Sequence, residues 1–184
     1  VPGAIAGAAG VMTTRAYMHS AYALVSRDDV RVTGFDDPQM KRLRIGVQSV
    51  GDDAVTPPVE ALLSRGLAGN LRPYTLHGNA SDPNTAGGMV HAVAARDIDA
   101  AVLWGPFAGY YAARQDIALN VVAVAAAPQD PPMDFAISMA VRSGDVALRD
   151  ALDRALAANR PAITAILGDY HVPLLPIPRA EGSP

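Results

Sequence analysis

Residues 98–106 read IDAAVLWGP, a run of small and β-branched apolar residues that predicts a buried strand. Such a composition is typical of a parallel strand that is covered on both faces. Gly105 can adopt unusual backbone dihedrals and Pro106 cannot continue a ladder, so we expect the chain to turn there. Trp104, the single tryptophan, would lie at the carboxyl end of this strand, where open α/β sheets bind ligands. The run therefore predicts a binding cleft or an interface rather than a reaction centre.

Alternating strand and helix patterns precede this run. We expect strands at residues 43–48 and 72–76, separated by a helix that begins after Thr56. Apolar residues recur in that segment at the spacing of one helix face. A second helix, capped by Asn84 or Thr85, leads into the buried strand. The order strand, helix, strand, helix, strand predicts a compact α/β lobe whose connections are right-handed crossovers.

Further elements flank this lobe on both sides, and a proline-rich tail at residues 173–184 predicts an extended, loosely held end. Pro161 interrupts the last helical pattern, since proline removes a backbone donor and kinks a helix. We expect these flanking elements to be, in chain order, a strand at residues 17–25, a helical turn at 35–40 capped by residues 36–38, a helix at 107–114, strands at 120–125 and 135–141, and a helix that opens after residues 143–145.

The composition excludes several classes of function. The 184 residues hold no cysteine, which excludes disulfides, thiol catalysis and thiolate metal sites. The formal net charge is −3, so the chain lacks the excess of basic residues that is typical of a protein that binds nucleic acid. No apolar run approaches the roughly 18–20 residues that span a bilayer. Hydrophobic residues make up 50% of the chain, so it can bury a core as one domain or as two small lobes.

Several motifs form a recognisable set: TTRAY at residues 13–17, RVTGFDDP at 31–38 with LRIGVQ at 43–48, VGDD at 50–53 with TPP at 56–58, IDAAVLWGPFAGY at 98–110, and MDFAISMAVRSGD at 133–145. In combination they resemble the C-terminal part of a type II periplasmic solute-binding protein. The strongest resemblance is to the J-type accessory proteins of quinoprotein (PQQ-dependent) methanol and alcohol dehydrogenases. Proteins of this type have two α/β lobes joined by hinge strands, with the ligand held in the cleft.

The resemblance implies an α/β fold of the periplasmic binding protein type II, with one complete small α/β lobe and a partial second lobe. We expect residues 1–42 to form the partial lobe 1 and the first hinge crossing, 43–104 the complete lobe 2, 105–172 the return to lobe 1 with a C-terminal helix, and 173–184 the extended tail. Two features depart from the family. Ala16 replaces a proline, and the opening strands and helix of lobe 1 precede this region in the family. We expect a partner to cover the sheet edge and apolar face left open without them.

The function that the resemblance implies is that of a non-catalytic periplasmic accessory protein. It would dock on a PQQ-dependent alcohol or methanol dehydrogenase and stabilise or mature that complex, or act as the small subunit of a membrane-associated quinohaemoprotein alcohol dehydrogenase. PQQ and haem c would belong to the partner catalytic and cytochrome c subunits, and this chain would bind no cofactor and reach the membrane only through them. Two alternatives stay open: a substrate-binding protein of an ABC transporter for a small solute, and an unrelated cytoplasmic α/β enzyme.

The candidate binding residues are aromatic, acidic and basic side chains near the expected strand ends. Trp104 with Tyr110 and Tyr111 could form an aromatic wall or an interface anchor, although ordinary packing is an equal interpretation. Arg15 and Tyr17 could line the opposite side, or lie on the surface.

A polar loop and a helix start supply two further candidates. Asp53, next to Asp52, could hold a cation through its carboxylate, or be a solvated turn residue. Thr56 precedes two prolines at an expected helix N-terminus, where an anion could bind. The simpler interpretation is that Thr56 caps that helix.

No catalytic constellation is visible in the sequence. The histidines His19, His77, His91 and His171 have no spaced partner, and no Gly-x-Ser-x-Gly elbow or phosphate-binding glycine loop occurs. Without a Cys-x-x-Cys-His motif the chain does not attach c-type haem covalently. We therefore expect that the chain is not an enzyme by itself and that it holds no metal.

Overall fold

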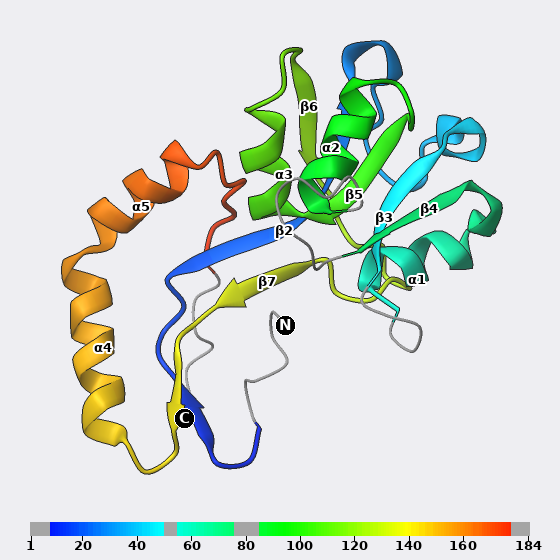
Figure 1. The fold of residues 1–184 in the computed structure, drawn as a ribbon. Helices are drawn as coiled ribbons and strands as arrows, with labels where there is room; N and C mark the ends of the chain where they lie inside the picture. The colour runs from blue at the N-terminus through cyan, green and yellow to red at the C-terminus, as the bar shows by residue number, and fades with distance from the viewer. Residues whose placement is uncertain (1–7, 50–54, 76–84, 178–184) are drawn as a thin grey trace. The chain divides into compact units, whose positions relative to one another are not determined.

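A computed structural model of the chain describes residues 8–49, 55–75 and 85–177 (Figure 1). The chain divides into two compact units. Among the described residues, unit 1 holds 8–20, 135–169 and 174–177, and unit 2 holds 21–49, 55–75, 85–134 and 170–173.

A mixed β-sheet forms the centre of unit 2. Its strands follow the order β4-β3-β5-β2-β6. β3 runs parallel to both β4 and β5, whereas β2 runs antiparallel to β5 and β6. The strand bounds are Met18–Arg27 for β2, Ile45–Ser49 for β3, Leu71–Thr75 for β4, Ala100–Trp104 for β5 and Leu119–Ala123 for β6. The first residues of β2 belong to unit 1.

The predicted buried strand is confirmed in β5, which lies between β3 and β2. Its first four residues are buried, and side chains alternate between the two faces of the sheet because successive strand residues point to opposite sides. Val102 belongs to one core cluster, whereas Ala101 and Leu103 belong to the other. On β2, Leu24 and Val25 divide between the clusters in the same way.

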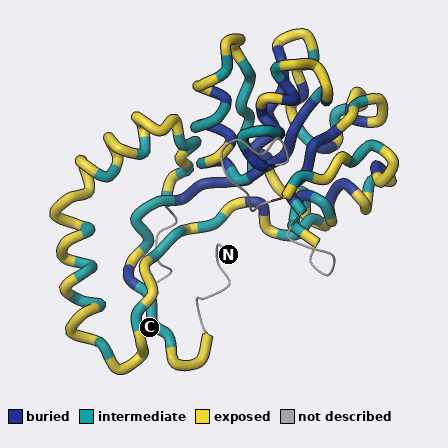
Figure 2. The backbone as a smooth tube through the Cα atoms, in the orientation of Figure 1, coloured by how far each residue is buried: buried dark blue, intermediate teal, exposed yellow. Residues whose placement is uncertain are grey.

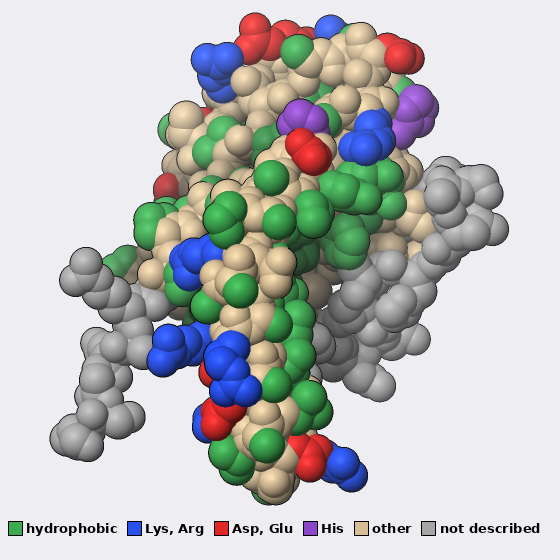
Figure 3. Space-filling model, turned by 90° about the vertical axis from the view of Figure 1, so that its left-hand side faces the viewer, with side chains coloured by type: hydrophobic (Ala, Val, Ile, Leu, Met, Phe, Trp, Pro, Cys, Tyr) green, Lys and Arg blue, Asp and Glu red, His purple; other side chains and the backbone are tan. Residues whose placement is uncertain are grey.

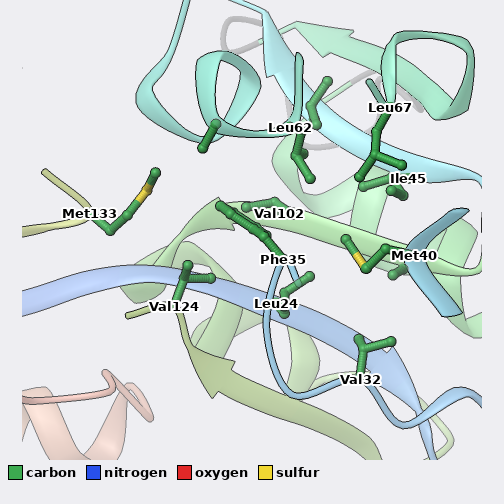
Figure 4. Packing of buried hydrophobic residues seen from close by; sticks show 13 residues of the cluster. Leu24, Val32, Phe35, Met40, Ile45, Leu62, Leu67, Val102, Val124 and Met133 are labelled. Carbon is green, nitrogen blue, oxygen red and sulfur yellow. The ribbon is translucent and has the colours of Figure 1, made fainter. Parts of the chain in front are cut away.

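Helices cover both faces of this sheet. α1 (Pro57–Ser64) contributes Leu62 to the first cluster, which Figure 4 shows with Phe35 and Met40. α2 (Ala86–Ala94) and α3 (Gly105–Ala112) supply the second cluster. Figure 2 shows the buried residues concentrated in the strands between these helices. Unit 2 is therefore a three-layered α/β/α structure with a hydrophobic cluster on each face of its sheet.

Several local predictions are confirmed at the helix starts. Asp37 accepts a hydrogen bond from the Gln39 backbone at 3.0 Å and precedes a proline in the 3-10 helix Pro38–Arg42. Thr85 caps α2 by accepting from the Gly88 backbone. Further 3-10 helices span Asp28–Val30 and Ala68–Asn70.

Unit 1 contains a small sheet and two helices. β1 (Val11–Thr13) pairs antiparallel with β8 (Ala140–Arg142), and β7 (Asp134–Ile137), which begins at the last unit 2 residue, pairs with β2. The single strand predicted at residues 135–141 is thus two strands. The predicted helix interruption is confirmed, since α4 (Val146–Ala158) ends before α5 (Arg160–Asp169) begins.

The observed units differ from the predicted ranges. Residues 43–104 were expected to form the complete lobe, but β2, α3 and β6 from outside this range belong to the same sheet and core. β2 lies inside the sheet, between β5 and β6, so unit 2 extends over residues 21–134. Residues 170–172, predicted in the return segment, and residue 173, predicted in the tail, also belong to unit 2. Within the described residues, no helix has both the length and the apolar character to cross a bilayer.

Candidate functional site

Two neighbouring strands place Trp104 and Gln48 at one edge of the unit 2 sheet. β3 and β5 are parallel neighbours, so their carboxyl ends lie at the same edge. The Trp104 backbone N–H donates to Oε1 of Gln48 at 3.3 Å. Gln48 is buried, and Trp104 is half-buried at the N-cap of α3. The predicted position of Trp104 at a strand end is therefore confirmed.

Tyr22 completes this strand-end cluster, which we define as Tyr22, Gln48 and Trp104. Tyr22 faces Trp104 in the antiparallel register of β2 and β5, and the two rings meet edge to face with centroids 5.6 Å apart. Burial raises the pKa of the Tyr22 hydroxyl, so the phenol stays protonated at neutral pH. The sequence predicted only a strand at residues 17–25, which includes Tyr22, because the register of Tyr22 against Trp104 depends on a pairing between distant strands.

The side-chain amide of Gln48 carries an unused donor. The Trp104 N–H requires an acceptor, which fixes the side chain with Oε1 toward that group. Nε2 is buried, and in the part of the chain that the structure describes it has no hydrogen-bond partner. An unpaired buried donor costs about 1–3 kcal/mol, and such groups are enriched where function requires them. The cluster can thus combine aromatic contact with hydrogen bonding to an acceptor atom.

Thr56 lies next to this cluster but does not cap its helix. It occupies the N-cap position of α1, yet its side chain makes no capping hydrogen bond. Its hydroxyl instead donates to the Gln48 carbonyl oxygen at 3.4 Å, which ties the helix start to the end of β3. The capping interpretation is therefore wrong. The two loop acids, Asp52 and Asp53, lie outside the described residues.

Tyr110 and Tyr111 make their ring contacts elsewhere. Tyr110 stacks on Tyr170 at 5.4 Å and meets Tyr111 edge to face at 5.1 Å. The guanidinium of Arg114 lies 3.5 Å from the Tyr110 ring centroid. Trp104 precedes α3, whereas both tyrosines follow about 9 Å later at a rise of 1.5 Å per residue. They therefore form a second aromatic cluster near the other end of the helix.

Arg15 and Tyr17 belong to unit 1, where they contact its helices and strands. The Arg15 backbone N–H donates to Asp153 of α4 at 2.7 Å, and the Tyr17 N–H donates to the Ile137 carbonyl at 2.9 Å. With side chains of α4 and α5 they line a small cavity of about 100 Å³. The structure thus brings these two predicted residues together.

The aspartates with lowered pKa values are held in ion pairs with arginines. Arg65 lowers the pKa of both Asp36 and Asp130, and Arg44 lowers the pKa of Asp99, in each case chiefly through side-chain hydrogen bonds. These carboxylates accept hydrogen bonds from arginine and so have structural roles. Among the described residues, no group of three or more His, Asp or Glu side chains is placed to hold a metal ion.

Comparison with known proteins finds periplasmic binding proteins among the similar structures. No protein-family profile matches the chain. The solved structure of the periplasmic binding protein XoxJ from Methylobacterium extorquens AM1 is 30% identical, with a TM-score of 0.75, and the match covers 90% of this chain and 74% of XoxJ. MxaJ from Methlophaga aminisulfidivorans MPT is 22% identical with a TM-score of 0.72, covering 92% of this chain and 73% of MxaJ, which shows likeness of fold alone.

A further relative, a J-type protein like XoxJ and MxaJ by its name, was found by sequence. Protein MoxJ from Methylorubrum extorquens AM1 is 27% identical over 182 residues. The match covers 91% of this chain and 59% of MoxJ, so the chain spans less than two thirds of that relative.

Proposed function

The chain belongs to the XoxJ family of periplasmic binding proteins, and from this membership we propose that it is a non-catalytic accessory protein of a methanol dehydrogenase system. It works in the periplasm, where it docks on the catalytic or cytochrome c subunit of a PQQ-dependent methanol or alcohol dehydrogenase and stabilises or matures that complex. PQQ and haem c belong to those partner subunits. This chain supplies a binding surface.

The observation that carries the proposal is the 30% identity to XoxJ over 90% of this chain, together with the similarity of the two folds, which has a TM-score of 0.75. The chemistry of the described residues supports a binding role, because the acids with lowered pKa values are engaged by arginines. Trp104 and Tyr22 offer the aromatic contact that dominates many protein interfaces. The amide of Gln48 adds a directional donor beside them.

The test is a binding experiment with purified methanol dehydrogenase holoenzyme and the full chain. We expect co-elution in size-exclusion chromatography and a higher thermal midpoint of the dehydrogenase, since a ligand of the native state stabilises it. Separate elution together with an unchanged midpoint would overturn the proposal. A small solute that raises the midpoint of this chain alone would instead favour solute delivery to a transporter.

Trp104→Ala locates the docking surface. Truncating a central aromatic anchor lowers affinity by about 2 kcal/mol or more, a factor of roughly thirty in Kd. Phe107→Ala is the matched control, because Phe107 is exposed on the neighbouring α3. Equal affinity of the wild type and the Trp104 variant would remove the strand-end cluster from the interface. Circular dichroism of both variants checks that the fold is intact.

A further inference from the structure

The strand β6 has an open edge within the described part of unit 2. It ends the strand order β4-β3-β5-β2-β6, and its one partner there is β2 (Figure 1). The Val124 N–H donates to the Tyr22 carbonyl oxygen at 2.8 Å. Because backbone groups of successive strand residues point to opposite edges, those of Leu119, Val121 and Ala123 point away from β2. Among the described residues, no backbone hydrogen bond from another element reaches these three, so the edge offers donors and acceptors to a further strand.

The two edges of the sheet differ in how they are protected. At the other edge, β4 carries Arg72 and Pro73, and both residues are exposed. Charged side chains and proline discourage the addition of a strand, because proline lacks the backbone donor. β6 reads LNVVA, and residues 117–127 around it contain neither a charged residue nor a proline. The sequence therefore blocks strand addition at β4 and leaves it open at β6.

A pocket of about 500 Å³ lies beside the β6 edge. Leu119 and Val121 line it from β6, and both also pack against the second core cluster, on the face of the sheet that α3 covers. The space exists because its other walls include small residues, namely Gly109, Ala112 and Ala113. A strand added to β6 places every second side chain on this face. The side chain opposite Val121 thus reaches the pocket, whose volume is in the range of ligand sites.

The charges beside this pocket favour a basic partner. The pocket lining holds one carboxylate, that of Asp116, and no lysine or arginine. Asp116 is exposed, and in the described ranges of the chain no cation pairs with it. The nearby Arg114 packs on the Tyr110 ring and donates to the Tyr110 carbonyl oxygen at 2.9 Å. Figure 3 shows the side of unit 2 on which α3 and β6 lie, with scattered charged side chains among hydrophobic and uncharged ones.

We propose that β6 is a docking edge for an extended segment of a partner protein. The segment pairs with Leu119, Val121 and Ala123, inserts a large apolar side chain into the pocket and sets a lysine or arginine against Asp116. In this mode of recognition the main chain supplies affinity and the pocket supplies specificity. In an antiparallel register, the residue two positions after the apolar one lies opposite Leu119, on the side of Asp116. This edge is separate from the strand-end cluster and goes beyond the function proposed above.

Amide exchange of the nitrogen-15 labelled full chain, followed by NMR, tests the proposal. The probe is the acetylated and amidated peptide TTTFTKT, in which the lysine follows the phenylalanine by two positions. In the chain alone, we expect rapid exchange of the Leu119, Val121 and Ala123 amides. Saturating peptide should slow that exchange about tenfold or more, because hydrogen-bonded amides are protected. The Val122 amide, which faces β2, should exchange slowly in both states.

Modified peptides separate strand addition from other contacts. The phenylalanine N–H of the probe faces β6, so methylating this nitrogen should raise the Kd about tenfold or more by leaving an acceptor unpaired. Methylating the threonine amide just before it is the matched control, since that amide faces solvent, and the Kd should stay unchanged. Glutamate in place of the lysine should weaken binding about fivefold, and Asp116→Asn should remove this difference.

Two variants of Val121 test the edge itself. Val121→Pro removes an N–H that points away from β2 and should abolish binding of the peptide, because edge strands tolerate proline at such positions. Val121→Thr keeps the N–H and the branched shape, and it should bind like the wild type. Slow amide exchange in β5 of both variants shows that unit 2 remains folded.

Several results would overturn the proposal. Slow exchange of the edge amides in the chain alone, at every concentration, would mean that another segment of this chain covers β6. Protection that rises with the concentration of the chain alone would make a second copy the occupant. Equal binding of the two methylated peptides, or no saturation at about 1 mM probe, would exclude docking by strand addition. No dehydrogenase is present in these experiments, so their outcome is independent of the proposed function.

Discussion

Arg65 is the residue that joins distant parts of unit 2. Its guanidinium donates two hydrogen bonds to Asp130, at 2.6 and 3.0 Å, and two to Asp36, at 2.7 and 3.2 Å. The Asp130 side chain is 1% exposed and also accepts from the Ala127 backbone. The carboxylate of Asp130 is therefore buried, and its charge is compensated mainly by this one arginine.

Arg65→Met should destabilise unit 2 strongly. The substitution keeps most of the aliphatic volume but leaves the Asp130 carboxylate buried without its cation, which typically costs about 3 kcal/mol or more. Urea unfolding followed by the fluorescence of Trp104 measures the change. Arg31→Met is the matched control, since Arg31 pairs with Asp28 on the surface, and we expect a loss of about 1 kcal/mol or less. Equal losses for both variants would contradict this role of Arg65.

The same pair predicts a pH dependence. Arg65 lowers the pKa of Asp130 below the value of about 3.9 that an unfolded chain shows. The pair therefore stabilises the fold above that pH, and its contribution is lost as the pH falls through the lowered pKa. In Arg65→Met, protonation of Asp130 relieves the unpaired charge. The stability gap between the wild type and this variant should narrow below about pH 4, and a gap that stays constant from neutral pH downward would refute the prediction.

At the scale of elements, α3 connects the strand-end cluster with the segment at residues 170–173. The helix begins directly after Trp104, two residues before the predicted start at residue 107, because Pro106 is favoured in the first turn of a helix. Gly109 faces the returning chain so closely that an added Cβ would collide with the His171 carbonyl oxygen. The rings of Tyr110 and Tyr170 stack and so make a second contact between α3 and this segment.

Gly109→Ala should separate α3 from this segment. Because the clash is with backbone, relief requires a shift of the main chain, and overpacking of this kind costs about 1–3 kcal/mol. Gly168→Ala on α5 is the control, since nothing lies within 4 Å of the added Cβ. There alanine should be neutral or slightly favourable to the helix. Thermal unfolding of both variants gives the comparison, and an unchanged midpoint for Gly109→Ala would contradict the close contact.

For the whole molecule, the two units differ in what stabilises them. Unit 2 buries apolar side chains on both faces of its sheet, with Leu62 and Leu103 fully buried in different clusters. Unit 1 has strands and helices without a buried hydrophobic residue among those described. The free energy of folding of the chain alone is therefore concentrated in unit 2.

Two leucine truncations should distinguish the contributions of the two units to the stability of the chain. Leu62→Ala opens a cavity in a close-packed core and should cost about 2–5 kcal/mol. Leu148→Ala removes an exposed side chain and should change stability by less than about 1 kcal/mol in the chain alone. Trp104 fluorescence reports the unfolding of unit 2, and far-UV circular dichroism adds the helices of unit 1. Comparable losses for both variants would show that α4 already belongs to a packed core.

Local patterns in the sequence predicted several of the elements and some of their ends. The apolar run at residues 98–104 predicted a buried strand, and the cap at residues 36–38 predicted a short helix; both are confirmed. Pro161 marked the break between α4 and α5. These features depend on backbone restrictions and side-chain periodicity within a few residues, which are properties of the chain itself.

Contacts between distant residues required the folded molecule. Pairing of β2 with β5 set Tyr22 against Trp104, and parallel pairing of β3 with β5 placed Gln48 beside the same residue. The exposure of Leu148 on α4 and Ile166 on α5 likewise could not be predicted from the sequence, because an amphipathic pattern is the same whether or not another segment covers the helix. Strand register and burial arise from chain segments that meet only on folding, and no local periodicity encodes which segments those are.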